Sequence, residues 1–136
     1  MFANDPKRIL IADNDEDVLI ALERTLETAG YDTSLAFDAR GIYRTVSNST
    51  FDLVVLDDYL SDKDSFEVLA HFQTAGILRP VVVTHHRYPA PEDQQRLRSL
   101  GASAFINKTA HSELVHIVRF LLETQRGCGD EYESFT

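Results

Sequence analysis

The chain has 136 residues, of which 43 % are hydrophobic and 26 % are charged, and its net charge is −9. This length suits one domain with a single core and leaves no room for a second catalytic domain. The 13 basic residues are scattered, which disfavours direct nucleic-acid binding. The sequence has no apolar run of membrane-spanning length, residues 1–8 lack a signal-peptide core, and the lone Cys128 excludes a disulfide framework. These features predict a cytoplasmic protein.

The first third of the chain predicts two strand-and-helix units. An aliphatic run over residues 7–12 indicates a strand, and apolar residues at helical spacing over 18–29 indicate a helix that Gly30 ends. Residues 31–36 alternate as a half-buried strand does, and residues 39–46 follow a helical pattern.

The third unit contains the most apolar strand. Residues 51–56 are apolar on both faces apart from Asp52, which is typical of a central strand in a parallel sheet covered by helices on each side. A helical pattern over residues 66–73 follows, and Gly76 ends it.

The fourth unit starts with the β-branched run at residues 80–84. A loop follows, and Pro91 or Glu92 opens a polar helix that ends near Gly101. The two histidines of that loop, His85 and His86, are adjacent and so point apart, which argues against a metal pair.

The fifth unit has a short strand at residues 103–106 and a helix with a broad apolar stripe, which Ser112 is expected to cap. Five such units predict an α/β fold with a parallel sheet, right-handed crossovers and helices on both faces. The polar, Gly-rich segment 127–136 is expected to be disordered or to begin a linker.

Polar side chains follow four of the predicted strands. They are Asp13, Asn14 and Asp15 after the first, Asp57 and Asp58 after the third, Thr84 after the fourth and Lys108 after the fifth. Because ligands bind beyond the carboxyl ends of parallel strands, these groups are expected to share one site. Clustered carboxylates call for a cation, and Mg²⁺ prefers oxygen ligands. An Asp beside Mg²⁺, a Lys and a hydroxyl is suited to accept a phosphoryl group.

The order and spacing of ILIADNDEDV, DLVVLDDYL, VVVTHH and GASAFINK resemble the receiver domain of bacterial two-component response regulators. The resemblance covers about residues 7–124 and implies a receiver domain over residues 1–126. It further implies a flavodoxin-like (βα)5 fold, a doubly wound parallel sheet with strand order 2-1-3-4-5.

The resemblance also implies roles for individual residues. Asp57 resembles the phosphoacceptor. Asp13 and Asn14 match the acidic pair that, with Asp57 and the backbone carbonyl of Tyr59, holds Mg²⁺. The other matches are Thr84 as the switch hydroxyl, Lys108 as the paired ammonium and Phe105 as the aromatic that turns inward on activation.

The implied partners are a histidine kinase or phosphotransfer protein as donor, and a downstream protein or output domain as recipient. Such a domain is not an enzyme for another substrate, because it assists only its own phosphorylation and dephosphorylation. A homodimer through the fourth helix, fifth strand and fifth helix is a further possibility that the resemblance raises.

Four positions depart from the family pattern. Asn14 brings no charge to the second acidic position, His85 fills a place that is usually small, and Thr109 replaces a Pro, so no cis peptide is expected there. Asp58 replaces an aliphatic residue and is expected to point away from Asp57. These departures leave open a pseudo-receiver that acts through protein contacts without phosphorylation.

Two other functions are less favoured. LIADND and LVVLDD resemble motifs of Asp-nucleophile phosphatases of the haloacid dehalogenase type, but Asp57 precedes Thr84 and Lys108 here, and those enzymes have the opposite order. A nucleotide-fold electron carrier would need a Gly-rich or Ser/Thr-rich loop after the first strand, and the sequence has none.

Overall fold

The computed structural model describes residues 6–124, so Cys128 and the predicted tail at 127–136 lie outside the described residues. The strands are β1 (Arg8–Ala12), β2 (Asp32–Ala36), β3 (Leu53–Asp57), β4 (Val81–His85) and β5 (Ala102–Asn107). The helices are α1 (Glu16–Thr28), α2 (Ala39–Asn48), α3 (Ser65–Thr74), α4 (Pro91–Ser99) and α5 (His111–Thr124).

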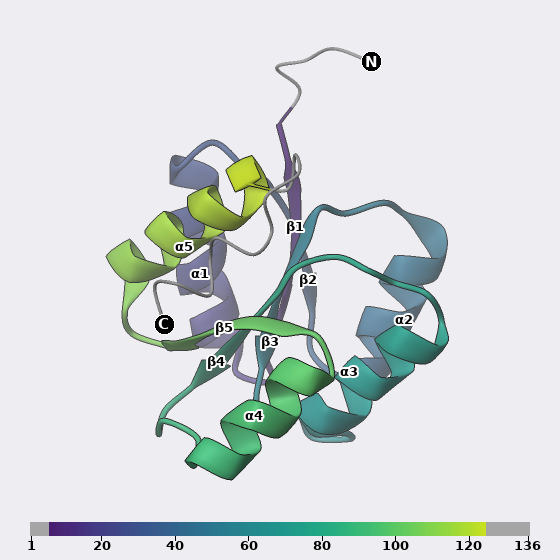
Figure 1. The fold of residues 1–136 in the computed structure, drawn as a ribbon. Coiled ribbons are helices and arrows are strands. Elements are labelled where there is room, and N and C mark those ends of the chain that lie inside the picture. Colours follow the sequence, from purple (N-terminus) through teal and green to yellow (C-terminus); the bar gives the residue numbers. More distant parts are fainter. Residues whose placement is uncertain (1–5, 125–136) are drawn as a thin grey trace.

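All strand pairs are parallel, and the sheet order is β2-β1-β3-β4-β5. Helices α1 and α5 cover one face of the sheet, and α2, α3 and α4 lie on the other (Figure 1). The predicted doubly wound, flavodoxin-like fold with strand order 2-1-3-4-5 is therefore confirmed.

The core has two halves, one on each face of the sheet, and the central strand β3 contributes side chains to both. Leu53 and Val55 pack in the cluster beside α1 and α5, whereas Val54 and Leu56 pack in the cluster on the opposite face. Successive side chains of a strand point to opposite faces, so a strand buried on both sides must be apolar throughout. This constraint ends at Asp57, the last residue of β3.

Three of the helices have an aspartate as N-cap, the residue directly before the first helical turn. The side chains of Asp15, Asp38 and Asp64 accept hydrogen bonds from backbone N–H groups in the first turns of α1, α2 and α3. In α3 the contact is reciprocal, since the side chain of Glu67 accepts from the backbone N–H of Asp64. Part of the acidic composition therefore serves to cap helices.

The predicted start of the last helix is wrong by two residues, since Ser112 as the cap would place the first helical residue at Glu113. Helix α5 begins at His111, because the N–H of Leu114 already donates to the carbonyl of Ala110, and Ser112 lies inside the first turn. The entry turn is shaped by Asn107, whose side-chain oxygen accepts from the N–H and the hydroxyl of Thr109.

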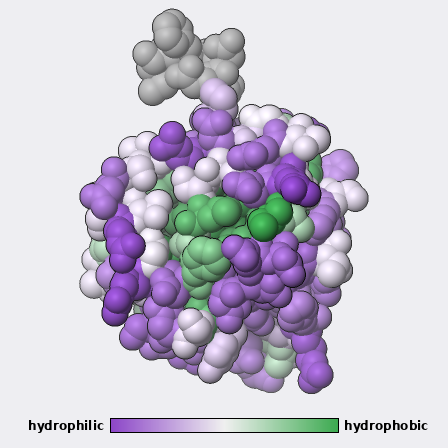
Figure 2. Space-filling model, turned by 180° about the vertical axis from the view of Figure 1, so that it is seen from behind, coloured by the Kyte–Doolittle hydropathy of each residue, from purple (hydrophilic) through white to green (hydrophobic). Residues whose placement is uncertain are grey.

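Three large aromatic side chains are exposed in the segments that follow strands. Phe37, Tyr59 and Tyr88, in the segments after β2, β3 and β4, are all more than half exposed. Seen from behind, a mostly hydrophilic surface surrounds one apolar area (Figure 2). Within residues 6–124 no helix combines the length and apolarity needed to cross a bilayer.

Two residues of α1 test the core assignment. Leu22 is 1 % exposed and Ile20 is 37 % exposed. Leu22→Ala is expected to lower the free energy of unfolding by about 2–5 kcal/mol, because it removes buried methyl groups and leaves a cavity. Ile20→Ala is expected to change it by about 0.5 kcal/mol or less. Urea unfolding followed by circular dichroism measures both, and equal losses would contradict the assignment.

Candidate functional site

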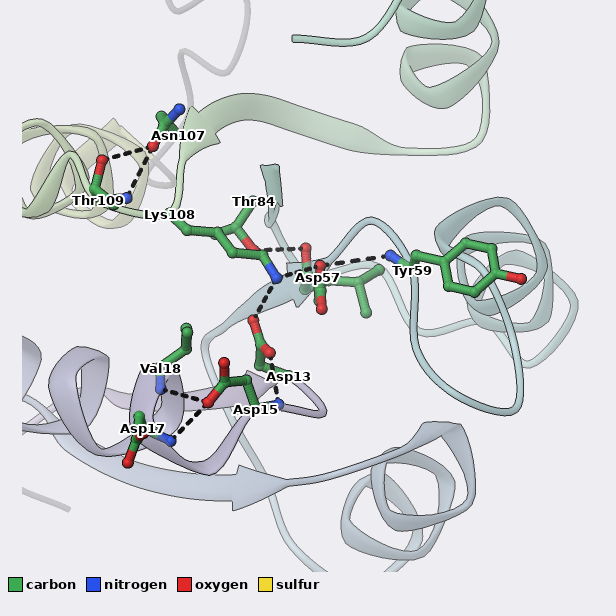
Figure 3. A network of polar contacts seen from close by, with 11 residues as sticks. Asp13, Asp15, Asp17, Val18, Asp57, Tyr59, Thr84, Asn107, Lys108 and Thr109 are labelled. Atoms are coloured by element: carbon green, nitrogen blue, oxygen red, sulfur yellow. Dashed lines mark hydrogen bonds and ion pairs between the residues drawn. The ribbon is translucent and has the colours of Figure 1, made fainter. Parts of the chain in front are cut away.

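The side chains of Asp13, Asp57 and Lys108 meet in a buried pocket at the carboxyl ends of the strands (Figure 3). The Nζ atom of Lys108 lies 3.0 Å from Asp13 Oδ2 and 2.9 Å from Asp57 Oδ1. Asp13 is 0 % exposed, Asp57 is 1 % exposed and Lys108 is 7 % exposed. The one ammonium therefore serves two carboxylates away from solvent.

The sheet register brings these groups together. Ala12 pairs with Leu56 across β1 and β3, so the next residues, Asp13 and Asp57, leave the sheet side by side. Asp57 in turn pairs with Thr84 of β4. Lys108 follows β5, and its backbone N–H donates to the carbonyl of His85 at the end of β4. Four neighbouring strands, β1, β3, β4 and β5, thus fix the backbone positions of the site residues.

Burial sets the electrostatics of the pocket. It raises the pKa of Asp13 and of Asp57 because it disfavours the charged carboxylates, and Lys108 offsets only part of this effect. Burial also lowers the pKa of Lys108, but the two carboxylates outweigh it and raise that pKa above 10.5. Burial thus raises the pKa values of both acids, while the carboxylates raise that of Lys108. When both acids are ionised, two carboxylates share one ammonium, and one negative charge stays uncompensated.

The pocket suits a further cation. Asp13 Oδ2 lies close to Nζ but has no directed hydrogen bond among the described residues, so this buried oxygen can take another partner. Its other oxygen accepts from the N–H of Asp15. Within residues 6–124 no cluster of three acidic, His or Cys side chains could hold a metal. Any cation here would need neutral oxygens besides the two buried carboxylates.

Two neutral oxygens were predicted from the sequence, and the structure treats them differently. The backbone of Tyr59 lies beside the pocket, because its N–H is 3.5 Å from Asp57 Oδ1, while its ring points away and is 70 % exposed (Figure 3). Asn14 is exposed to solvent between Asp13 and the helix cap Asp15. The Oδ1 atom of Asp15 accepts from two backbone N–H groups of α1. This carboxylate therefore caps the helix and does not take the place of the acid that Asn14 replaces.

The two predicted switch residues are both buried. The hydroxyl of Thr84 donates to the carbonyl of Leu56 over 3.5 Å. Phe105 is 7 % exposed and lies under the guanidinium of Arg98, whose Cζ is 4.9 Å from the ring centroid. Phe105 therefore points inward, with a cation–π contact from α4.

His85 is buried and His86 is exposed, so the adjacent histidines do point apart as predicted. The His85 ring packs edge-on against Tyr88 at a centroid distance of 4.9 Å. Neither ring nitrogen has a hydrogen-bond partner among the described residues, and burial lowers the pKa of the imidazole. A bulky, buried side chain, directly after Thr84 in β4, thus packs against Tyr88.

The prediction for Asp58 is wrong. Asp58 is half-buried, and its side chain contacts that of Asp57 and raises the pKa of Asp57. Its N–H still donates to the carbonyl of Thr84, in register with the β3–β4 ladder, but the backbone bends at Asp58 directly after β3 has ended, so strict alternation no longer applies. The replacement of Pro by Thr109 has no visible cost, since Lys108 reaches both carboxylates.

Comparison with known proteins agrees with this geometry. Residues 9–119 match the family described as the response regulator receiver domain. The response regulator MprA of Mycolicibacterium vanbaalenii is 33 % identical over 118 residues, which is 86 % of this chain and 51 % of that protein. The chain thus spans about half the length of this curated relative.

Solved structures share the fold. A CheY-like response regulator receiver domain protein from Methanospirillum hungatei superposes with a TM-score of 0.80 at 26 % identity, covering 97 % of this chain and 100 % of that one. The receiver domain of Francisella response regulator 1452 gives a TM-score of 0.82 at 21 % identity and covers 90 % of this chain and 100 % of that one.

Replacing Asp57 is expected to stabilise the fold. A carboxyl whose folded-state pKa is raised adds stability that is fully present below its ordinary pKa of 3.8 and is lost as the pH rises through the raised value. Asp57→Asn removes this loss, so its unfolding temperature should exceed that of the unaltered protein by a few degrees at neutral pH. The difference should shrink towards zero below pH 3.8 in calorimetric scans.

Lys108→Met provides the opposite arm of the same experiment. It leaves two buried carboxylates without their shared cation, and breaking a buried pair in this way costs about 3–5 kcal/mol. A lower unfolding temperature for Asp57→Asn at neutral pH, or a higher one for Lys108→Met, would show that the charge balance of the pocket is not as described.

Proposed function

Because the chain belongs to the response regulator receiver family, we propose that it is a two-component signalling domain in which Asp57 accepts a phosphoryl group. The donor in this proposal is a phosphohistidine on a histidine kinase or phosphotransfer protein. The supporting observation is the Lys108 ammonium held between the buried carboxylates of Asp13 and Asp57. A charged nucleophile, a fixed cation and a nearby hydroxyl are the groups that phosphoryl transfer requires.

The transfer step forms one bond and breaks one. A carboxylate oxygen of Asp57 attacks phosphorus, and the phosphorus–nitrogen bond of the donor breaks as the new phosphorus–oxygen bond forms. The imidazole leaves with the electron pair and takes a proton from solvent, and Asp57 becomes an acyl phosphate. Lys108 stays protonated because the two carboxylates raise its pKa, so it can donate to a transferred oxygen. Thr84, opposite Asp57 in the sheet, supplies a hydroxyl donor.

A bound Mg²⁺ would neutralise charge on the transferring oxygens. Asp13 and Asp57 would hold it with the carbonyl of Tyr59 and the amide oxygen of Asn14, all oxygen ligands of the kind that Mg²⁺ prefers. Two features support this set: the buried Oδ2 of Asp13 has the Lys108 ammonium as its ion-pair partner but no further hydrogen bond among the described residues, and the pocket has an unbalanced negative charge.

The signal would leave through the surface of α4, β5 and α5. Thr84 is coupled to β3 by its hydroxyl, and Phe105 contacts Arg98 of α4, so a shift of either residue changes this face. A downstream protein, an output domain or a second copy of the chain is the proposed partner. The cytoplasmic location and the domain boundary at residue 126 stay predictions.

Phosphorylation by a small-molecule donor tests the proposal directly. With acetyl phosphate and Mg²⁺ the protein is expected to gain one phosphoryl group by intact-mass spectrometry, and a chelator should abolish the gain. Asp57→Asn should gain none, whereas the neighbouring Asp58→Asn should still be modified.

If the unaltered protein gains no phosphoryl group, the proposal fails. The pseudo-receiver would then be the better reading, because Asn14 lacks the second charge and the buried His85 fills a position that is usually small in the family. A phosphoryl group that persists in Asp57→Asn would place the acceptor elsewhere.

Asn14→Asp is expected to tighten Mg²⁺ binding about tenfold, since an added unit charge near a solvated divalent ion contributes roughly 1–2 kcal/mol. Isothermal titration calorimetry measures the dissociation constant. Asn48→Asp adds the same charge at the exposed end of α2 and serves as the control. Equal tightening by both variants would mean that net charge, not the position of residue 14, sets the affinity.

A further inference from the structure

We propose that Asp62 is a positioning residue of the phosphorylation site. Its carboxylate ties the loop between β3 and α3 to the N-terminus of α2, and this contact keeps the backbone of Tyr59 beside Asp57. The inference rests on the proposed function, because the backbone it positions is that of a proposed metal ligand.

The tether consists of two hydrogen bonds between segments far apart in the chain. Asp62 Oδ1 accepts from the N–H of Ala39 at 2.9 Å, and Oδ2 accepts from the N–H of Arg40 at 3.2 Å. These N–H groups lie in the first turn of α2, where helix geometry leaves backbone donors without internal partners. The hydrogen bond from Ala39 is the main cause of a lowered pKa for Asp62, as expected for a carboxylate that backbone donors stabilise.

Asp62 sits at the tip of the loop that leaves the phosphoacceptor strand. The N–H of Leu60 donates to the carbonyl of Lys63, which closes a short loop around Asp62. Leu60 is fully buried below this loop, and Tyr59 forms a β-bridge with Asp64 on the return segment. Two residues, Leu60 and Ser61, separate Asp62 from Tyr59, so a displacement of the tip is passed to Tyr59 over a short segment.

The composition of the loop makes an external tether necessary. Residues 58–65 contain neither Pro nor Gly, so no restricted or unusual backbone conformation fixes their path. The entry to the loop is held by the hydrogen bond from Asp58 to the carbonyl of Thr84, and the exit is held by the Asp64 cap of α3. Asp62 holds the tip between them against a different element of the fold.

A simpler role for Asp62 is that it only caps α2. The chain offers a matched control for this role, because Asp38 also caps α2 by accepting from the N–H of Gly41 at 2.8 Å. Asp38 directly precedes the helix that it caps and does not belong to the β3–α3 loop. Loss of Asp38 therefore weakens the helix start without freeing the loop.

The test compares Asp62→Ala, Asp62→Asn and Asp38→Ala by two measurements. In Asp62→Ala, amide hydrogen exchange at Tyr59 and Leu60 should accelerate in the metal-free protein. The dissociation constant for Mg²⁺, from amide shifts in a nuclear magnetic resonance titration, should rise about tenfold, as for other residues that orient a metal ligand. Asp38→Ala should leave both values unchanged. Asp62→Asn keeps one of the two acceptor oxygens without the charge, and its NH2 group cannot accept from the second N–H, so it should restore both values in part.

Unchanged exchange at Tyr59 and Leu60 in Asp62→Ala would overturn the inference. So would an equal loss of Mg²⁺ affinity in Asp38→Ala, or an Asp62→Asn protein that behaves like Asp62→Ala, since the effect would then come from helix stability or from charge. Should the unaltered protein bind no Mg²⁺ and accept no phosphoryl group, the proposed function fails by itself. Amide hydrogen exchange at Tyr59 and Leu60 in the metal-free protein then still shows whether Asp62 holds the loop in place.

Discussion

The site depends on one interaction, the ammonium of Lys108 between the buried carboxylates of Asp13 and Asp57. Without it, two acids would face each other in a pocket that excludes water, and both would become neutral or the strand ends would separate. The ammonium allows the charges to stay, but it balances only one of them. The pocket is therefore stable enough to fold and still attracts a further cation.

The apolar sheet gives this interaction its precision. Strands β3 and β4 are buried along their whole length, so their registers are fixed by the packing on both faces. A slip of one residue would move every side chain to the opposite face and would take Asp57 out of the pocket. The hydrophobic residues of the strands thus determine where a carboxylate, a hydroxyl and an ammonium meet, although none of them takes part in the chemistry.

Much of this arrangement can be predicted from the sequence, for a physical reason. The change from apolar to charged residues at Asp57 marks the end of a strand buried on both faces, and five such units leave few possible topologies. The site residues Asp13, Thr84 and Lys108 follow from the same boundary. Sequence alone does not show how a side chain turns once the strand has ended, and for this reason the direction of Asp58 was predicted wrongly.

Helix starts and loop contacts are harder to predict because the residues involved look like ordinary surface acids. Ser112 has the right chemistry for a cap, but Asn107 shapes the turn earlier and the helix begins before it. The contact of Asp62 with Ala39 joins positions that lie 23 residues apart, and no local sequence pattern predicts it. Such contacts depend on how two loops meet in space.

The acids of this chain consequently fall into two electrostatic classes. Asp62 accepts from backbone N–H groups, and its pKa is lowered, so its stabilising contribution is present at neutral pH and is lost as the pH falls through the lowered value. Burial raises the pKa values of Asp13 and Asp57, so their protonation at acid pH relieves a cost. A fall in pH therefore removes the cost of the buried charges of Asp13 and Asp57, and at the same time it weakens the hydrogen bonds that Asp62 accepts. Since the same residue type does both, net charge alone says little about how this fold responds to pH, and the local partners of each carboxylate determine the sign.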